Sequence, residues 1–169
     1  MNSTIVDKIA LTIRDAQIGK DDQTPLPFIY ADLDTQNILL DNVGVPFAAC
    51  APLSSGMVSN THNRFHERAT FEVFFGDLME QDLADYDAVA NEHIIDTCKR
   101  RAFKWLASIR PASGVQLISI NSAQRAYLQF DSIVTGYLVN VTLEEMDGLG
   151  LCDYTPEHVP TEDEQQAAK

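Results

Sequence analysis

The sequence predicts an α+β protein, in which an antiparallel sheet of about four to six strands with a long hairpin is packed by an N-terminal helix and a long central helix. Apolar residues recur every three to four positions near the N-terminus and again in residues 85–109, the spacing of a helix with one apolar face. Residues 68–75 and 137–144 alternate between apolar and polar side chains, as half-buried strands do.

The length and the hydrophobic content favour one domain. The chain has 169 residues, of which 45% are hydrophobic, enough to bury a full core without disulfides or metals. Residues 1–150 are predicted to form a single α+β domain. Residues 151–169 are polar, acidic and without periodicity, so they are predicted to be an acidic C-terminal tail.

The first half of the chain predicts a helix and two strands. Ser3 or Thr4 can cap a helix that ends before Gly19, because apolar residues with helical spacing follow at once. Residues 28–32 and residues 47–53 have the apolar character of short strands.

A long hairpin is predicted next. Pro52 places the end of its first strand at an edge or a bulge, and the Ser-, Asn- and Gly-rich residues 54–63 are expected to form its tip. In the returning strand, Phe74 falls among the polar positions. It is therefore predicted to be an exposed aromatic residue, covered either by a helix or by a neighbouring subunit.

The central helix has clear boundaries. Five of the eleven residues 77–87 are acidic, which places negative charge ahead of and within a helix N-terminus. Pro111 and Gly114 end the helix. Residues 115–120 are predicted to form a strand, residues 121–125 a turn, and the last strands follow it.

The charge excludes some functions. Twenty-five acidic residues against twelve basic ones give a net charge of −13, which disfavours direct binding of nucleic acid. No apolar stretch has the length of a signal-peptide core or of a membrane span, so a soluble intracellular product is expected. Cys50, Cys98 and Cys152 are odd in number and widely spaced, which favours buried or free thiols over disulfides or a zinc site.

Two histidine arrangements suggest chemistry. His62 and His66 have the spacing that places two metal ligands on one helical face, but they lie where a loop runs into a strand, so a polar hairpin is favoured. His93 and Cys98 are five residues apart, an offset that separates them on a helix, and His93 is predicted to be a hydrogen-bonded core residue.

No motif predicts a catalytic, cofactor or metal site. The sequence has no phosphate-binding glycine loop of the G-x-x-x-x-G-K or G-x-G-x-x-G type and no G-x-S-x-G turn. The carboxylates Asp82, Asp85 and Asp87 lack the spacing of a calcium loop, and helix capping explains them. The prediction is therefore a protein that is not an enzyme and that binds no cofactor.

A family resemblance is carried by three stretches: HERATFEVFFGDL (residues 66–78), DYDAVANEHIIDTCKRRAFKWLASI (85–109) and AYLQFDSIVTGYLVNVTLEEM (126–146). Their order resembles the tail terminator and tail completion (neck) family of tailed bacteriophages. The resemblance implies a virion structural protein that forms a homo-oligomeric ring, expected to be a hexamer, at the head-proximal end of the tail tube. Its partners would be further copies of itself, the tail tube protein and the head-to-tail connector or head-closure protein.

In such a ring, one subunit must meet a different patch on its neighbour. The residues expected at that interface belong to the hairpin: Ser54, Met57, Val58, Phe65 and Phe74. DNA would pass through without specific binding, because an acidic channel repels phosphate. The residues expected to face the channel belong to the acidic run: Asp77, Glu80, Asp82 and Asp85.

Two alternatives remain. One is a head-closure or tail-completion adaptor of the same assembly. The other is a small intracellular enzyme or ligand-binding domain with a metal near His62, His66 and Glu67. For the ring protein, the expected location is the tail or neck of the virion, and the host cytoplasm during assembly.

Overall fold

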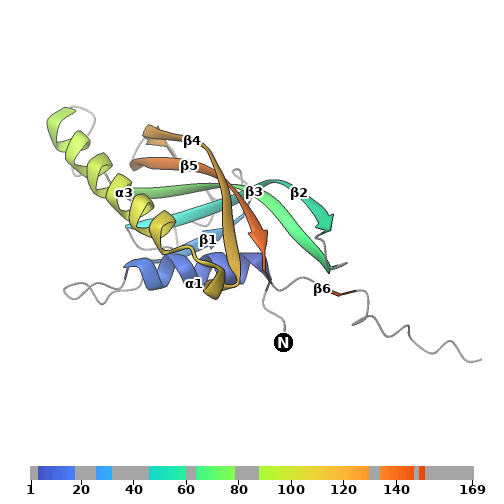
Figure 1. Cartoon of the computed structure of the whole chain (residues 1–169). Helices are drawn as coiled ribbons and strands as arrows, with labels where there is room; N and C mark the ends of the chain where they lie inside the picture. Colours follow the sequence, from blue (N-terminus) through green and yellow to red (C-terminus); the bar gives the residue numbers. More distant parts are fainter. Residues whose placement is uncertain are drawn as a thin grey trace, which may run out of the picture.

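A computed structural model describes residues 4–17, 26–31, 46–59, 64–78, 88–129, 134–146 and 149–150. Two α-helices, α1 (Ile5–Gln17) and α3 (Ala88–Ser108), lie against one sheet (Figure 1). A short 3₁₀ helix, η2 (Pro111–Ser113), follows α3. The strands are β1 (Phe28–Tyr30), β2 (Phe47–Ser59), β3 (Arg64–Leu78), β4 (Val115–Gln129), β5 (Val134–Glu145) and β6 (Leu149–Gly150).

The strand order is β1-β2-β3-β5-β4, and β6 pairs with the start of β3. The predicted α+β class, the sheet of about five strands and the packing of both helices on it are confirmed. One detail differs, because β1 runs parallel to β2 whereas the other pairs are antiparallel, so the sheet is mixed. Sixteen residues, 31–46, separate β1 from β2, more than a tight hairpin needs and enough to permit a parallel return.

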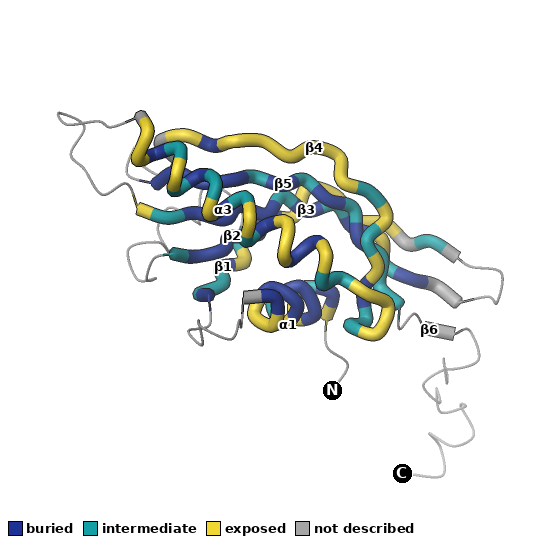
Figure 2. Tube along the Cα trace, turned by 60° about the vertical axis from the view of Figure 1, so that its left-hand side comes forward, coloured by how far each residue is buried: buried dark blue, intermediate teal, exposed yellow. Residues whose placement is uncertain are grey.

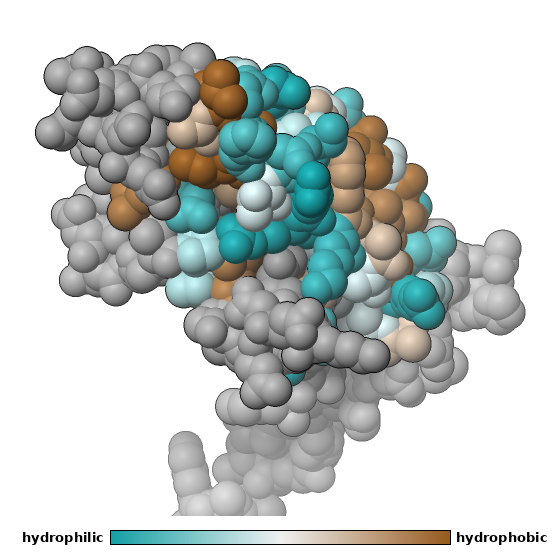
Figure 3. Space-filling model, turned by 90° about the vertical axis from the view of Figure 1, so that its left-hand side faces the viewer, coloured by the Kyte–Doolittle hydropathy of each residue, from teal (hydrophilic) through white to brown (hydrophobic). Residues whose placement is uncertain are grey.

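Both helices cover the same sheet face, called here the helix face. Ile5, Ile9 and Ile13 of α1 are buried there, and Phe71 and Phe75 contribute from β3. The buried side of α3 is lined by Ile95, Cys98, Ala102 and Trp105. Figure 3 shows hydrophilic side chains across the middle of the surface on the α3 side, with hydrophobic ones gathered on either side.

A buried hydrogen bond joins the two helices. The indole Nε1 of Trp105 donates to Oγ1 of Thr12 at 3.0 Å, and the same hydroxyl donates to the carbonyl oxygen of Ile9 at 2.8 Å. Trp105 also packs against Phe75, with ring centroids 5.8 Å apart. The indole therefore fills the space between helices and sheet with its polar atom satisfied.

The predicted start of α1 is confirmed, and Thr4 is the capping residue. Its Oγ1 accepts a hydrogen bond from the backbone N–H of Asp7 at 3.2 Å, while the Asp7 carboxylate accepts one from the N–H of Thr4 at 2.9 Å. This is a reciprocal capping box. The backbone and side-chain hydrogen bonds from Thr4 lower the pKa of Asp7.

Two predicted connections are wrong. Residues 54–59, expected at a hairpin tip, continue β2 after a bulge between Pro52 and Ser54. Residues 121–125, expected to form a turn, lie inside the continuous strand β4, which has three irregularities in its pairing with β5. The side-chain amide of Asn121 donates to Asn140 and Thr142 across the strands, so a turn-forming residue stabilises a strand instead.

The prediction that Phe74 is exposed is also wrong, because its side chain is only 4% exposed. It lies on the face opposite the helices, called here the open face, and its ring centroid is 5.9 Å from that of Phe47. Ile29, Ala49, Ala126 and Val134 are the other buried members of this second apolar cluster. Phe74 is therefore used inside the subunit.

Candidate functional site

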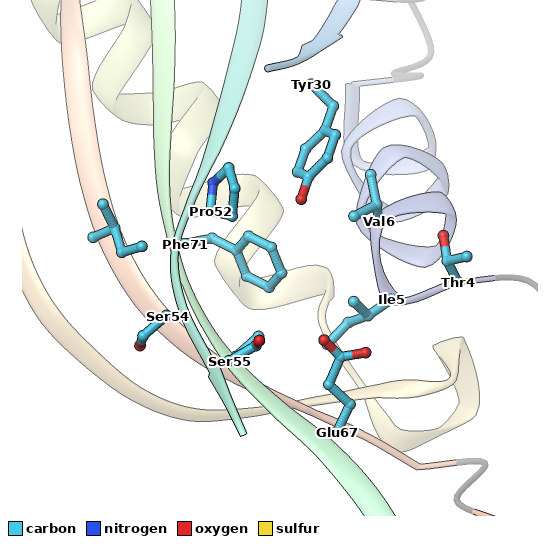
Figure 4. A pocket seen from close by; sticks show the side chains of 11 residues that line it. Thr4, Ile5, Val6, Tyr30, Pro52, Ser54, Ser55, Glu67 and Phe71 are labelled. Carbon is cyan, nitrogen blue, oxygen red and sulfur yellow. The ribbon is translucent and has the colours of Figure 1, made fainter. Parts of the chain in front are cut away.

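A pocket of about 550 Å³ opens on the helix face, where β2 and β3 pass the N-terminal end of α1 (Figure 4). Its described lining comes from four elements and consists of Thr4, Ile5, Val6, Tyr30, Pro52, Leu53, Ser54, Ser55, Glu67, Ala69 and Phe71. Figure 4 shows the rings of Tyr30 and Phe71 turned toward the space between α1 and the strands. The pocket is mainly apolar with a hydroxylated rim, the usual character of a recognition site.

The position of the pocket follows from the lengths of the strands. β1 ends at Tyr30, which is paired with Cys50, whereas β2 continues to Ser59. α1 begins at Ile5 and lies across this region (Figure 1). Pro52 and Leu53 therefore have no β1 residue beside them. This uncovered part of β2 forms one wall of the pocket.

The charge in the pocket is weakly negative. Glu67 contributes a carboxylate at the rim, and no cationic side chain belongs to the described lining. Partial burial raises the pKa of Tyr30, and the nearby Cys50 and Glu67 raise it further, so its phenol stays neutral at physiological pH. The pocket suits an apolar or a cationic group and disfavours an anion.

The sheet has two long edges in the described part of the chain. β4 is the last strand in the order, and Figure 2 shows it exposed along most of its length whereas β3 and β5 are largely buried. At the other side, β1 pairs only with residues 48–50 of β2, so the distal part of β2 (residues 53–59) is a second edge. Strand edges with open backbone groups can add another strand.

The open face carries a polar network beyond the Phe74 cluster. Thr70 and Thr142 are hydrogen-bonded at 3.1 Å, and Asn121 extends the network to Asn140. Arg68 donates to the Glu144 carboxylate. Among the described side chains, the network consists of hydroxyl, amide and carboxylate groups with one paired cation. The part of the open face that carries this network is called here the polar face.

The predicted interface residues are only partly brought together. Ser54 is exposed at the pocket rim and Val58 is half-buried farther along β2. Met57 and Phe65 lie in β2 and β3, and their side chains are outside the described part of the structure. Phe74 is buried in the subunit and is removed from this set.

Of the predicted channel residues, Asp77 lies at the end of β3 and pairs with Arg101 of α3 at 3.7 Å. Its carboxylate is thus half-buried beside a helix. Glu80, Asp82 and Asp85 lie outside the described residues.

Two residues of the predicted metal site lie on opposite sides of strand β3. His66 and Glu67 are consecutive in β3, so their side chains point to opposite sheet faces. The ring Nδ1 of His66 donates to the carbonyl oxygen of Glu145 at 2.8 Å, and His62 lies outside the described residues. Within the described ranges, no group of three His, Cys, Asp or Glu side chains is suited to hold a metal.

The second histidine prediction is wrong, because His93 is exposed on α3 while Cys98 is buried. The helix register that packs on the sheet runs through Ile95, Cys98 and Ala102 instead. Burial raises the pKa of Cys98 to about 11, with the nearby Arg101 opposing that rise, and raises the pKa of Cys50 to about 12. Both thiols are therefore poor nucleophiles at neutral pH.

Sequence reasoning missed Tyr30, Phe71 and the whole of β4 as site residues. The pocket residues come from four separated segments, so no local pattern could group them. For β4 there was a signal, since it has one charged residue in fifteen in a chain that is 22% charged. An exposed strand with so few charges is unusual for an edge.

Comparison with known proteins found no family model that matches the chain and no matching curated protein. Among the helices that the structure describes, none combines the length and the apolar character needed to cross a membrane.

Proposed function

We propose that this protein is a structural component of a phage tail, a tail terminator that forms a homo-oligomeric ring at the head-proximal end of the tail tube. The observation that carries the proposal is the one-sided packing of the sheet. In the described part of the chain both helices lie on the helix face and neither covers the polar face, which supports its use as a channel lining. That asymmetry supports a ring with the polar faces inward and the helices outward.

The chemistry of the polar face supports passage of DNA. Neutral hydroxyl and amide groups bring no positive charge to hold phosphates, and the guanidinium of Arg68 is paired with Glu144. The net charge of −13 per subunit adds long-range repulsion of phosphate. Glu72 is paired with Asn140 on the open face, so in this arrangement Glu72 and Glu144 face the channel, whereas Asp77 lies beside α3 and does not.

The partners of the ring are the tail tube protein below it and the connector or head-closure protein above it. The protein acts in the neck of the virion after assembly in the host cytoplasm. The mechanism makes and breaks no covalent bond: the ring ends the tube and leaves an open, weakly binding passage.

The test is the mass and shape of the purified full-length protein. Light scattering should give an oligomer of about six subunits, and negative-stain images should show a central hole. A monomer at high concentration would contradict the proposal, and a monomer with stoichiometric bound metal would support the enzyme alternative. Assembly only after mixing with a different ring protein would support the adaptor alternative.

A further inference from the structure

We infer that the copies in the ring join by strand addition: β4 of one copy pairs antiparallel with the distal part of β2 of the next, and Ile120 enters the pocket of that next copy. This interface rests on the proposed ring, and it names the surfaces that the ring uses.

The first argument is that both edges lack the usual protection. Natural proteins protect edge strands with charges or prolines that prevent pairing between molecules. β4 contains Arg125 as its single charged residue, and the distal part of β2, LSSGMVS, contains none. In a protein with a net charge of −13, two such neutral edges are the places where copies can approach without repulsion.

The second argument is the direction of the strands. β2 is antiparallel to β3, β3 to β5 and β5 to β4, so β4 runs opposite to β2. A second copy related by rotation about an axis along the strands keeps its orientation. Its β4 therefore meets β2 of the first copy antiparallel, with the helix faces on the same side.

The third argument is that Ile120 and the pocket lie on the same face. Ile120 is paired with Val141, whose side chain belongs to the core under the helices, so Ile120 also points to the helix face. Its side chain is 49% exposed. The pocket lies on the helix face beside the distal part of β2, lined by Phe71 and Leu53. Strand addition brings this apolar side chain over this apolar pocket.

The fourth argument concerns closure. The inserting residue and the receiving pocket lie at opposite edges of one sheet, so the contact is heterologous and each copy can both give and receive. Such a contact closes into a ring when the rotation between copies allows it. The sheet twist supplies a rotation of one sign between neighbouring strands. The polar faces then form one continuous surface.

Cysteine cross-linking tests the pairing. Ser54 and Ser122 are exposed on opposite edges, and each pairs with a residue of the open face, Thr70 and Asn140. In a Cys152→Ser background, S54C/S122C treated with a short bis-maleimide should give a ladder of covalent oligomers. Each single variant alone should stay monomeric on denaturing gels, and a mixture of the two should give dimers.

Several outcomes would overturn the inference. Cross-linking of S122C alone would show a two-fold contact between β4 strands. A ring-sized mass with no cross-link in the double variant would overturn this interface while leaving the ring proposal intact. A monomeric mass would overturn both the strand-addition interface and the ring proposal. The same result would follow if a segment of the same chain occupied the pocket.

A second variant tests whether Ile120 enters the pocket of the neighbouring copy. Ile120→Asp should shift the protein from the ring to the monomer mass, because a carboxylate would enter an apolar pocket beside Glu67. Leu11→Asp is the matched control, since Leu11 is also an exposed large apolar residue but lies on α1 outside the pocket lining. Both variants should keep the far-ultraviolet circular dichroism of the folded protein. Equal ring loss in both, or ring retention in Ile120→Asp, would contradict the proposed entry of Ile120 into the pocket.

Discussion

Lys8 shows how a single buried charge connects the N-terminal helix to the sheet. Its Nζ donates to the Glu145 carboxylate at 2.7 Å, and the Lys8 side chain is almost fully buried. The neighbouring pair of Arg68 and Glu144 lies on the open face, where Arg68 is much more exposed. Two adjacent glutamates thus hold ion pairs of different burial on opposite sheet faces.

We expect Glu145→Ala to lower the free energy of unfolding by about 2 kcal/mol, because Lys8 then loses a charged partner in a site shielded from water. Glu144→Ala is the matched control and should cost less than about 1 kcal/mol, as exposed ion pairs contribute little. Urea denaturation followed by the fluorescence of Trp105 measures both. Equal costs would show that burial does not distinguish the two pairs.

The buried thiols predict a loss of stability at alkaline pH. Burial raises the pKa of Cys50 to about 12 and that of Cys98 to about 11, from 9.0. The folded state favours the protonated thiols, so their contribution is complete below about pH 9 and falls as the pH rises toward the folded pKa values. The free energy of unfolding should therefore decrease between about pH 9 and pH 11.

The comparison for this prediction is a Cys50→Ala/Cys98→Ala variant, measured over the same pH range. Its unfolding free energy is lower throughout because small cavities form, but it should depend less on pH. An unchanged slope would show that other groups cause the alkaline loss.

At the level of secondary-structure elements, strands β3 and β5 approach each other closely in the middle of the sheet. Gly136 of β5 is paired with Gly76 of β3. A Cβ atom on Gly136 would overlap the carbonyl oxygen of Phe75 and lie 2.9 Å from the Cα of Gly76. Because these are backbone atoms, only a shift of the whole strand could make room.

Gly136→Ala should therefore destabilise the protein by about 3 kcal/mol, at the upper end of the cost of overpacking. Gly56→Ala, in the distal part of β2, is the control, since nothing lies within 4 Å of its added Cβ. Thermal unfolding of both variants gives the comparison. A normal melting temperature for Gly136→Ala would contradict the close approach of β3 and β5.

For the whole molecule, the packing of both described helices on one sheet face predicts at which positions a change of charge alters DNA binding. In the proposed ring, Glu72 lies on the polar face and Asp96 lies on α3 at the outside. Both residues are acidic, so replacing either with lysine changes the charge by the same amount. In the proposed ring Glu72 faces the channel, whereas Asp96 faces away from it.

Glu72→Lys should convert the channel surface into one that retains DNA, measured by filter binding of linear duplex at about 100 mM salt. The unmodified protein should show no retention, and Asp96→Lys should show much less than Glu72→Lys. Retention that is equal in the two variants would argue against the polar face as the channel lining.

Part of the candidate site could be expected from local sequence and part could not. Pro52 indicated an edge or a bulge and lies at a bulge, and the hairpin residue Ser54 lies at the pocket rim. Tyr30 and Ile120 carried no such signal. A pocket wall depends on where β1 stops relative to β2, and the exposure of Ile120 depends on β4 being the last strand of the described sheet.

Local sequence patterns alone predicted the α+β class, a cap at Ser3 or Thr4, the apolar side of the first helix and the alternation of β3 and β5. These features depend on interactions between residues close in the chain, and their periods are visible in one segment. The parallel direction of β1, the continuity of β4, the burial of Phe74 and the exposure of His93 became visible only in the folded structure. Each depends on which distant segment packs alongside, because the free energy of burying a side chain outweighs local preference.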